Sequence, residues 1–159
     1  MPVNIIIRKA ITEDLDGIRQ LFYDTVVTIN KKDYTKDQVK AWSSGYYYVE
    51  GWRTKLSDQN FYIAELNKRI VGFASFTHTG YIDFMYVHKN FQSQGIATML
   101  LETIEKQANN WGIKKLQADA SLTARPFFLR RGYELVKENV KRIDNVEFVN
   151  AVMTKEIRV

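Results

Sequence analysis

The sequence is most informative at Tyr86-Val87-His88-Lys89-Asn90-Phe91-Gln92-Ser93-Gln94-Gly95-Ile96-Ala97. An apolar run ends here, a short polar loop follows, and the longest helical pattern of the chain begins near Ile96. The first turn of a helix has unpaired N–H groups and partial positive charge, so an open backbone there binds phosphate. Gly95 and Ala97 leave that backbone open. The spacing Gln92-x-x-Gly95-x-Ala97 matches neither a dinucleotide fingerprint nor a Walker loop, so it predicts another kind of phosphate site.

Outward from this junction, hydrophobic spacing and turn residues predict a mixed order of strands and helices. We expect strands at 5–8, 61–65, 70–76, 81–87, 116–120, 133–142 and 146–156, and helices at 12–29, 35–42, 96–111 and 125–131. Thr12 is predicted to cap the first helix, and Thr35 with Gln38 forms a capping-box pattern. Residues 43–58, rich in aromatic side chains, are expected to form a long connection.

The composition indicates a single α/β domain over residues 1–159. The absence of Cys excludes disulfides and thiolate metal sites, and the presence of only 2 His disfavours a histidine metal centre, so no metal is expected. The net charge of +5 suits an anionic ligand such as a nucleotide. No apolar run approaches the roughly 20 residues of a membrane span, and residues 1–8 lack signal-peptide features. We therefore expect a cytoplasmic protein without membrane contact.

In their order along the chain, these segments resemble the GCN5-related N-acetyltransferase (GNAT) family, in particular an uncharacterised bacterial branch. The Gln92 to Ala97 spacing resembles the family's motif A, R/Q-x-x-G-x-G/A. Residues 121–133 resemble motif B, 6–15 the family's opening segment, and Val71-Gly72-Phe73 the strand upstream of motif A. The pattern from Tyr34 to Trp42 resembles the bacterial branch.

The resemblance implies a GNAT fold: a central twisted, mostly antiparallel sheet, flanked by helices, in which two parallel strands splay apart. The strand ending at Val87 and the strand at 116–120 would form this opening and hold acetyl-CoA. The implied cofactor residues are Met85, Tyr86 and Val87 for the pantetheine arm, Gln92, Ser93, Gln94, Gly95, Ile96 and Ala97 for the pyrophosphate, and Ser121, Arg125 and Phe128 beside them. Lys89 is a further cation for the phosphates.

The implied reaction is attack of a primary amine on the thioester. A base must first free the amine, which is protonated at neutral pH. Asp83 is the first candidate because it lies within an apolar strand beside the thioester, and Glu65 and His78 are weaker candidates. The motif B tyrosine, often the family's general acid, is replaced by Phe128. Tyr133, Tyr86 or Tyr81 could substitute, or the thiolate could leave without direct protonation.

The acceptor is expected to be a small-molecule or peptide amine in an aromatic pocket that includes Trp42, Tyr46 and Tyr47, although Trp42 could equally pack in the core. One alternative is a non-catalytic acyl-CoA-sensing module, which the phenylalanine in motif B favours. A nucleic-acid-binding domain is the weaker alternative, since only the charge supports it and no basic stripe with interleaved aromatics is evident; we expect no nucleic-acid partner. The terminal strands could pair with a second subunit to form a homodimer.

Overall fold

The computed structural model of the protein describes residues 4–157. Its strands are β1 (Ile6–Lys9), β2 (Asn60–Leu66), β3 (Arg69–Phe76), β4 (Tyr81–Val87), β5 (Lys115–Ala120), β6 (Glu134–Ile143) and β7 (Val146–Glu156). Its α-helices are α1 (Leu15–Thr28), α2 (Lys36–Ser43), α3 (Val49–Asp58), α4 (Ile96–Asn110) and α5 (Arg125–Arg130). Residues 1–3, part of the segment compared with signal peptides, lie outside the described range. Within 4–157, none of the helices has the length and apolar character needed to cross a bilayer.

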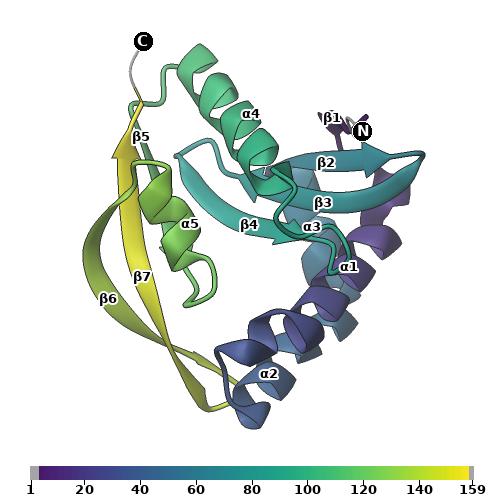
Figure 1. The fold of residues 1–159 in the computed structure, drawn as a ribbon, viewed down its shortest axis with the longest axis vertical. Coiled ribbons are helices and arrows are strands. Elements are labelled where there is room, and N and C mark those ends of the chain that lie inside the picture. Colours follow the sequence, from purple (N-terminus) through teal and green to yellow (C-terminus); the bar gives the residue numbers. More distant parts are fainter. Residues whose placement is uncertain (1–3, 158–159) are drawn as a thin grey trace.

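The strands form one seven-stranded sheet in the order β1-β2-β3-β4-β5-β7-β6 (Figure 1). The predicted antiparallel meander of β2, β3 and β4 is confirmed, and β7 pairs antiparallel with both β5 and β6. β4 and β5 are parallel, and their register joins Tyr81 to Gln117 and Ile82 to Ala118. Figure 1 shows the two strands diverging from each other. This divergence opens the middle of the sheet.

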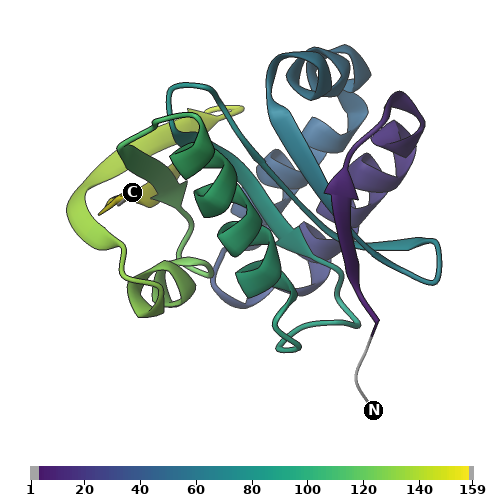
Figure 2. The ribbon, with the colours of Figure 1, turned by 90° about the horizontal axis from the view of Figure 1, so that it is seen from above.

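Helices cover both faces of the sheet, with α4 and α5 on one side and α1, α2 and α3 on the other (Figure 2). The neighbouring residues Phe73 and Ala74 of β3 show the alternation: Phe73 is buried with α1 and α3, and Ala74 with α4. Both are fully buried. Successive strand residues point to opposite faces, so β3 anchors two separate apolar clusters.

The predicted long connection at 43–58 is wrong. A 3-10 turn at Ser44–Tyr47 leads instead into α3. Val49, Trp52 and Leu56 pack on the cluster of α1, although Gly51 lies within the helix. The Trp52 ring is 6% exposed and stacks on Phe84 at 4.8 Å. Tertiary burial of this short apolar stripe therefore outweighs the low helix propensity of glycine.

The helix-start predictions had mixed outcomes. Thr35 forms the predicted capping box: its Oγ1 accepts from the Gln38 N–H at 3.1 Å, and Gln38 Oε1 accepts from the Thr35 N–H at 2.9 Å. Thr12 is not the N-cap of α1. A 3-10 turn precedes that helix, and the Asp14 carboxylate accepts from the Ile11 N–H at 2.8 Å. Arg8 also binds Asp14, so the carboxylate holds β1 and the start of α1 together.

The β6–β7 hairpin is long and curves until its tip reaches α2 (Figure 1). Its predicted turn at Asp144 and Asn145 is confirmed, with φ of 48° and 64°, as a two-residue hairpin turn requires. Gln38 Nε2 donates to the Glu147 carbonyl at 2.9 Å, and Ser44 Oγ donates to Asp144 Oδ2 at 3.1 Å. The hairpin therefore closes the side of the molecule that the splayed strands leave open.

Candidate active site

A cleft of about 1020 Å³ lies where β4 and β5 diverge. On one side of the sheet it is lined by the start of α4 and by α5. On the other side it is lined by α1, α2, α3 and the β6–β7 hairpin. The cleft therefore connects both sides of the sheet through the gap between two strands.

The loop before α4 presents an open backbone to the cleft. Gly95 is the N-cap with φ of +82°, and no side chain caps this helix. A Cβ added to Gly95 would meet no atom within 4 Å. Gln92 has a structural contact, because its Nε2 donates to the Val87 carbonyl at 2.6 Å. The predicted loop residues that line the cleft are Gln92, Ser93, Gly95, Ile96 and Ala97, whereas Gln94 is not among them.

Strand alternation places backbone groups of β4 on the splayed edge. The His88 N–H donates to Val71 of β3 at 2.8 Å. Backbone groups alternate between the two edges of a strand, so those of Met85 and Val87 face the gap. The Val87 carbonyl also accepts from Thr25 Oγ1 of α1 at 3.2 Å. The gap therefore offers a backbone edge that a peptide-like chain could join.

Asp83 lies at a bulge in β4, where the register with β3 shifts between Ser75 and Phe76. Its Oδ2 accepts from Lys55 Nζ and from Gln59 Nε2, both at 2.7 Å. Gln59 is held in turn by the Ser75 hydroxyl at 2.7 Å. The carboxylate lines the cleft, and its side chain is 16% exposed. The two contacts to Oδ2 therefore fix the orientation of the Asp83 carboxylate.

A second carboxylate, Asp119, also lines the cleft and was missed by the sequence analysis. Tyr81 Oη donates to Asp119 Oδ2 at 3.2 Å. Burial raises the pKa of Tyr81 well above its ordinary value, and the charges of Asp119 and Asp83 raise it further. Lys55 was missed as well, because it lies in the segment predicted to be a connection. The available signal for Asp119 was its place near the end of the strand that borders the splay.

The cations expected at the cofactor phosphates are arranged differently from the prediction. Arg125 donates to Glu138 of β6 at 2.9 Å and is not among the cleft-lining residues, and neither is Lys89. Arg130 and Arg131, which the sequence analysis did not assign to the site, line the cleft at the end of α5. Ser121 also lines it, and Ser121 Oγ accepts from the Ala124 N–H at 3.1 Å.

Two aromatic residues of the α5 region have different places. Phe128 lines the cleft and is 3% exposed. Tyr133, a predicted catalytic residue, does not line it. Its hydroxyl donates to Glu105 Oε2 of α4 at 2.8 Å, and burial together with that carboxylate strongly raises its pKa. The structure therefore does not bring Tyr133 to the reacting groups.

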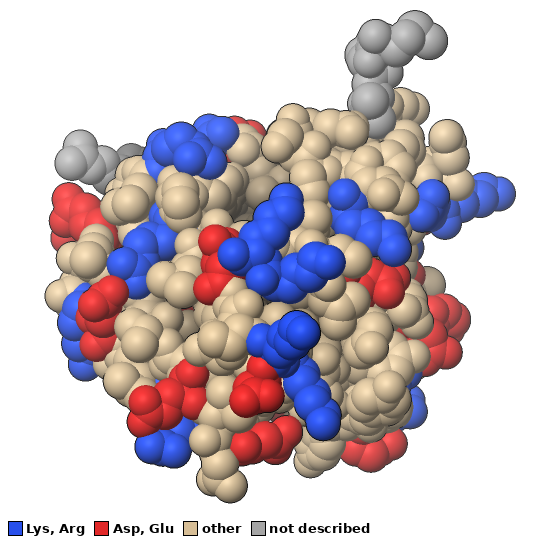
Figure 3. All heavy atoms as spheres, turned by 60° about the horizontal axis from the view of Figure 1, so that its bottom comes forward, with Lys and Arg blue, Asp and Glu red and all other residues tan. Residues whose placement is uncertain are grey.

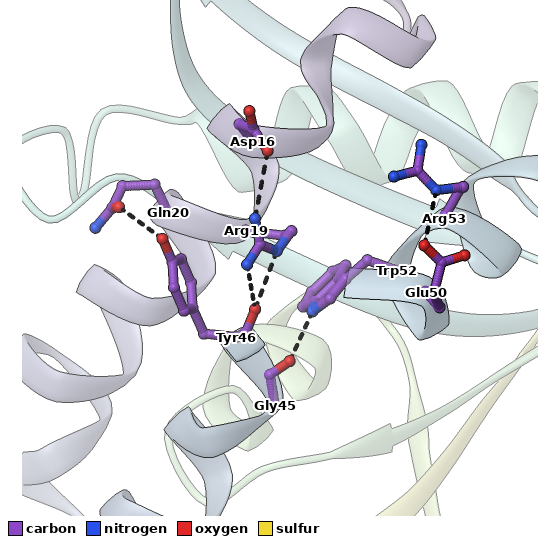
Figure 4. Close-up of polar contacts among 8 residues, drawn as sticks. All are labelled: Asp16, Arg19, Gln20, Gly45, Tyr46, Glu50, Trp52 and Arg53. Atoms are coloured by element: carbon purple, nitrogen blue, oxygen red, sulfur yellow. Dashed lines mark hydrogen bonds and ion pairs between the residues drawn. The ribbon is translucent and has the colours of Figure 1, made fainter. Parts of the chain in front are cut away.

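The aromatic wall of the cleft consists of Tyr34, Trp42, Tyr48, Trp52 and Phe148. The predicted residues Tyr46 and Tyr47 are not part of it. Figure 4 shows the Tyr46 carbonyl accepting from Arg19, at 3.0 Å from Nε and 2.8 Å from the second guanidinium nitrogen. Arg19 also lies over the Tyr46 ring at 4.4 Å, and Tyr47 is 71% exposed. Of the predicted acceptor residues, the structure therefore places Trp42 at the cleft.

One buried polar group in the cleft has no protein partner. Asn30 is 6% exposed and lines the cleft, and its Oδ1 has no hydrogen bond within the described chain. Buried polar atoms are rarely left unpaired without a reason. Sequence patterning gave no signal for this residue, which follows the apolar stripe of α1.

The weaker base candidates lie elsewhere. Glu65 accepts from Arg8 at 3.2 Å, His78 stacks on Trp111 at 4.6 Å, and neither lines the cleft. His88 is 9% exposed, and burial lowers its pKa. Among residues 4–157 no group of three or more His, Asp or Glu side chains is arranged to hold a metal ion.

On the face shown in Figure 3, Lys and Arg side chains are interspersed with Asp and Glu. No continuous basic stripe crosses that face.

The sheet opened between two parallel strands, with a bare helix start beside the opening, is the arrangement that the resemblance to acyl-CoA N-acyltransferases implies. Residues 30–156 match the acetyltransferase (GNAT) domain family. The uncharacterised N-acetyltransferase YafP of Escherichia coli (strain K12) is 30% identical over 150 residues, covering 94% of this chain and 95% of that protein. The chain therefore belongs to the GNAT family and is an N-acetyltransferase, as the sequence analysis predicted.

Solved structures agree with this assignment. A GCN5-related N-acetyltransferase from Rhodopseudomonas palustris is 31% identical, covers 98% of both chains and superposes with a TM-score of 0.94. The PaiA N-acetyltransferase from Thermoplasma acidophilum, solved in complex with coenzyme A, is 18% identical with a TM-score of 0.75, covering 96% of this chain and 99% of that one. The predicted mixed α/β GNAT fold is confirmed.

Proposed function

We propose that the protein transfers an acetyl group from acetyl-CoA to a primary amine of a small molecule or peptide, by direct attack in a ternary complex and within a single domain. The observation that carries this proposal is the continuity of the cleft from the bare start of α4, through the β4–β5 gap, to Asp83 and the aromatic wall. Two substrates entering from opposite sides would meet in the gap. No acetylated enzyme intermediate is needed, because the amine attacks the thioester directly.

The cofactor would use three parts of the cleft. Its pyrophosphate would accept from the N–H groups of the first turn of α4, where Gly95 leaves space. Its pantetheine arm would pair with the backbone of Met85 and the N–H of Val87, because the Val87 carbonyl already accepts from Thr25 and Gln92. Arg130 and Arg131 supply positive charge for the phosphates, and Phe128 supplies an apolar wall beside the arm.

Asp83 is the proposed base. Lys55 and Gln59 hold its Oδ2, which leaves Oδ1 to take a proton from the ammonium group, directly or through a water molecule. The freed nitrogen then attacks the carbonyl carbon. A backbone N–H on the splayed edge of β4, from Met85 or Val87, would stabilise the oxyanion.

The acceptor side of the cleft favours a cationic amine. Aromatic faces attract cations, and the aromatic wall described above surrounds the route to Asp83. Asp119 adds a further negative group on this side. The unpaired Oδ1 of Asn30 can accept a hydrogen bond from one of the substrates.

The test is acetyl-CoA turnover against tryptamine, spermidine, glucosamine and a peptide with a free N-terminus. Released thiol can be measured directly with a thiol reagent, because the protein contains no Cys. Asp83→Asn should lower kcat about 100-fold while calorimetry shows unchanged affinity for acetyl-CoA. Asp58→Asn, at the exposed end of α3 outside the cleft, is the matched control. Full turnover by Asp83→Asn would assign the base to another group, with Asp119 the next to test.

A further inference from the structure

We propose that Tyr34 is the general acid of this reaction: it donates its phenolic proton to the sulfur of coenzyme A as the thioester C–S bond breaks. The inference rests on the proposed function, since it requires acetyl-CoA in the cleft. The amine nitrogen forms its bond to the carbonyl carbon, and the electron pair of the C–S bond goes to sulfur. Sulfur takes the Tyr34 proton. The nitrogen loses a proton to water as the amide forms, and the phenolate regains one from solvent, so the products are a neutral amide and a thiol.

The position on α5 that faces the gap cannot supply this proton. Phe128 lines the cleft with a hydrocarbon ring. Four tyrosines among the described residues line the cleft instead: Tyr34, Tyr48, Tyr81 and Tyr86. A phenol that is to protonate the sulfur must lie beside the open part of the gap with its own proton free.

Three of these tyrosines do not meet that requirement. Tyr48 is 65% exposed at the cleft margin. The Tyr81 hydroxyl donates a hydrogen bond to Asp119, and Tyr81 lies where β4 still pairs with β5, at the closed end of the gap. The Tyr86 ring packs within the apolar cluster of α1, against Phe22 at 5.3 Å and Phe73 at 5.5 Å. Tyr34 remains.

The hydroxyl of Tyr34 lies at the end of β5. Its oxygen accepts from the Leu122 N–H at 2.7 Å, and β5 ends at Ala120. Ala120 and Ser121 both line the cleft. The hydroxyl therefore borders the gap on the β5 side, opposite the free edge of β4 along which the cofactor arm is proposed to lie.

The direction of this hydrogen bond suits an acid. Leu122 donates, so the proton of Tyr34 is not used in the contact. Burial raises the pKa of Tyr34 above its ordinary value, so the phenol is protonated at neutral pH. Hydrogen bonding from the Leu122 N–H and from Ser121 lowers this pKa, which favours the phenolate that remains after proton transfer. The charge of Asp33 raises the pKa and outweighs the opposite effect of Arg125.

The ring and its loop are held in place. The Tyr34 ring packs edge-on against Trp42 at 5.1 Å and is tilted against Phe148 at 5.8 Å. The preceding residue, Asp33, accepts from Thr123 Oγ1 at 2.8 Å. Two consecutive residues therefore fix this loop to the segment that follows β5, which keeps the phenol at a defined point of the gap.

Tyr34→Phe tests the proposal in the same thiol-release assay. We expect kcat to fall about 100-fold, at the lower end for general acid catalysis because a thiolate is a good leaving group. The affinity for acetyl-CoA should stay within about twofold of wild type, because the lost proton acts on the leaving group and not on binding. Tyr62→Phe, a buried tyrosine of β2 outside the cleft, is the matched control and should leave kcat unchanged.

A second variant separates acid catalysis from a structural role. Adding Phe128→Tyr to Tyr34→Phe returns a phenol to the cleft from α5 and should recover part of the lost kcat, which a packing role for Tyr34 would not permit. An unchanged kcat for Tyr34→Phe, or a loss confined to acetyl-CoA affinity, overturns the proposal while leaving the proposed function intact. A wild-type protein that turns over no amine overturns the proposed function, and this inference with it.

Discussion

The hydroxyl of Tyr133 lies 2.8 Å from Glu105 Oε2, and Lys155 Nζ approaches the same carboxylate at 3.2 Å. This contact joins the start of β6 to α4 and β7, away from the cleft. A buried hydrogen bond to a charged group contributes about 2 kcal/mol to stability. The Tyr133 hydroxyl therefore stabilises the fold and does not reach the cleft.

Tyr133→Phe should consequently destabilise the protein by about 2 kcal/mol and leave kcat close to wild type. Urea denaturation gives the first quantity and the thiol-release assay gives the second. A large loss of kcat with an unchanged free energy of unfolding would contradict this structural role and make Tyr133 a candidate general acid again.

At the scale of residues, the sequence predicts the cleft-lining residues that stand out against their immediate neighbours in the chain. Asp83 is a carboxylate within an apolar strand, and Gly95 is a glycine at a strand-to-helix junction. Asn30, Lys55 and Asp119 reach the cleft only because distant elements pack around it. The spacing of residues along the chain does not predict such contacts between distant elements. Tyr46 was misplaced for the same reason, since its contact with Arg19 turns it toward α1.

Among the elements, the junction of β4 and α4 has the most direct functional consequence. Gly95 adopts φ of +82° in front of open space. A side chain there would meet strain from the backbone, and a negative one would also occupy the proposed pyrophosphate site.

Gly95→Glu should weaken acetyl-CoA binding by more than about 100-fold, or roughly 3 kcal/mol, as measured by calorimetry. Gly95→Ala is the matched control: it should lower stability by about 1 kcal/mol and retain most of the affinity. If Gly95→Glu binds acetyl-CoA as the wild type does, the pyrophosphate does not lie at the start of α4.

The sequence predicted every strand and most helices, because their alternation, caps and turn residues are strong local signals. Both exceptions are governed by tertiary contacts. α3 forms because Trp52 is buried against Phe84. Thr12 does not cap α1 because Asp14 binds both Arg8 and the Ile11 N–H. In each case a partner distant along the chain or an ion pair outweighs local propensity.

For the molecule as a whole, the sheet is weakest at its centre. β6 and β7 pair over most of their length, whereas the parallel register of β4 and β5 joins two residue pairs. The cofactor arm is proposed to lie in the remaining gap. Ligand binding to the folded state alone raises stability by about 2.7 kcal/mol at a concentration 100 times Kd.

Acetyl-CoA at that concentration should therefore raise the melting temperature by about 5–10 °C, given the size of the chain. Differential scanning fluorimetry measures this shift, and Gly95→Glu should show none. An equal shift in both proteins would mean that acetyl-CoA stabilises the fold from a site other than the β4–β5 gap.

The short pairing between β4 and β5 also has a consequence for how readily proteases cut the protein. Proteases cut a protein mainly from its transiently opened states, whose population falls as stability rises. If acetyl-CoA completes the sheet as proposed, the molecule would open less often while that co-substrate is abundant. Its resistance to proteolysis would then rise with the concentration of acetyl-CoA.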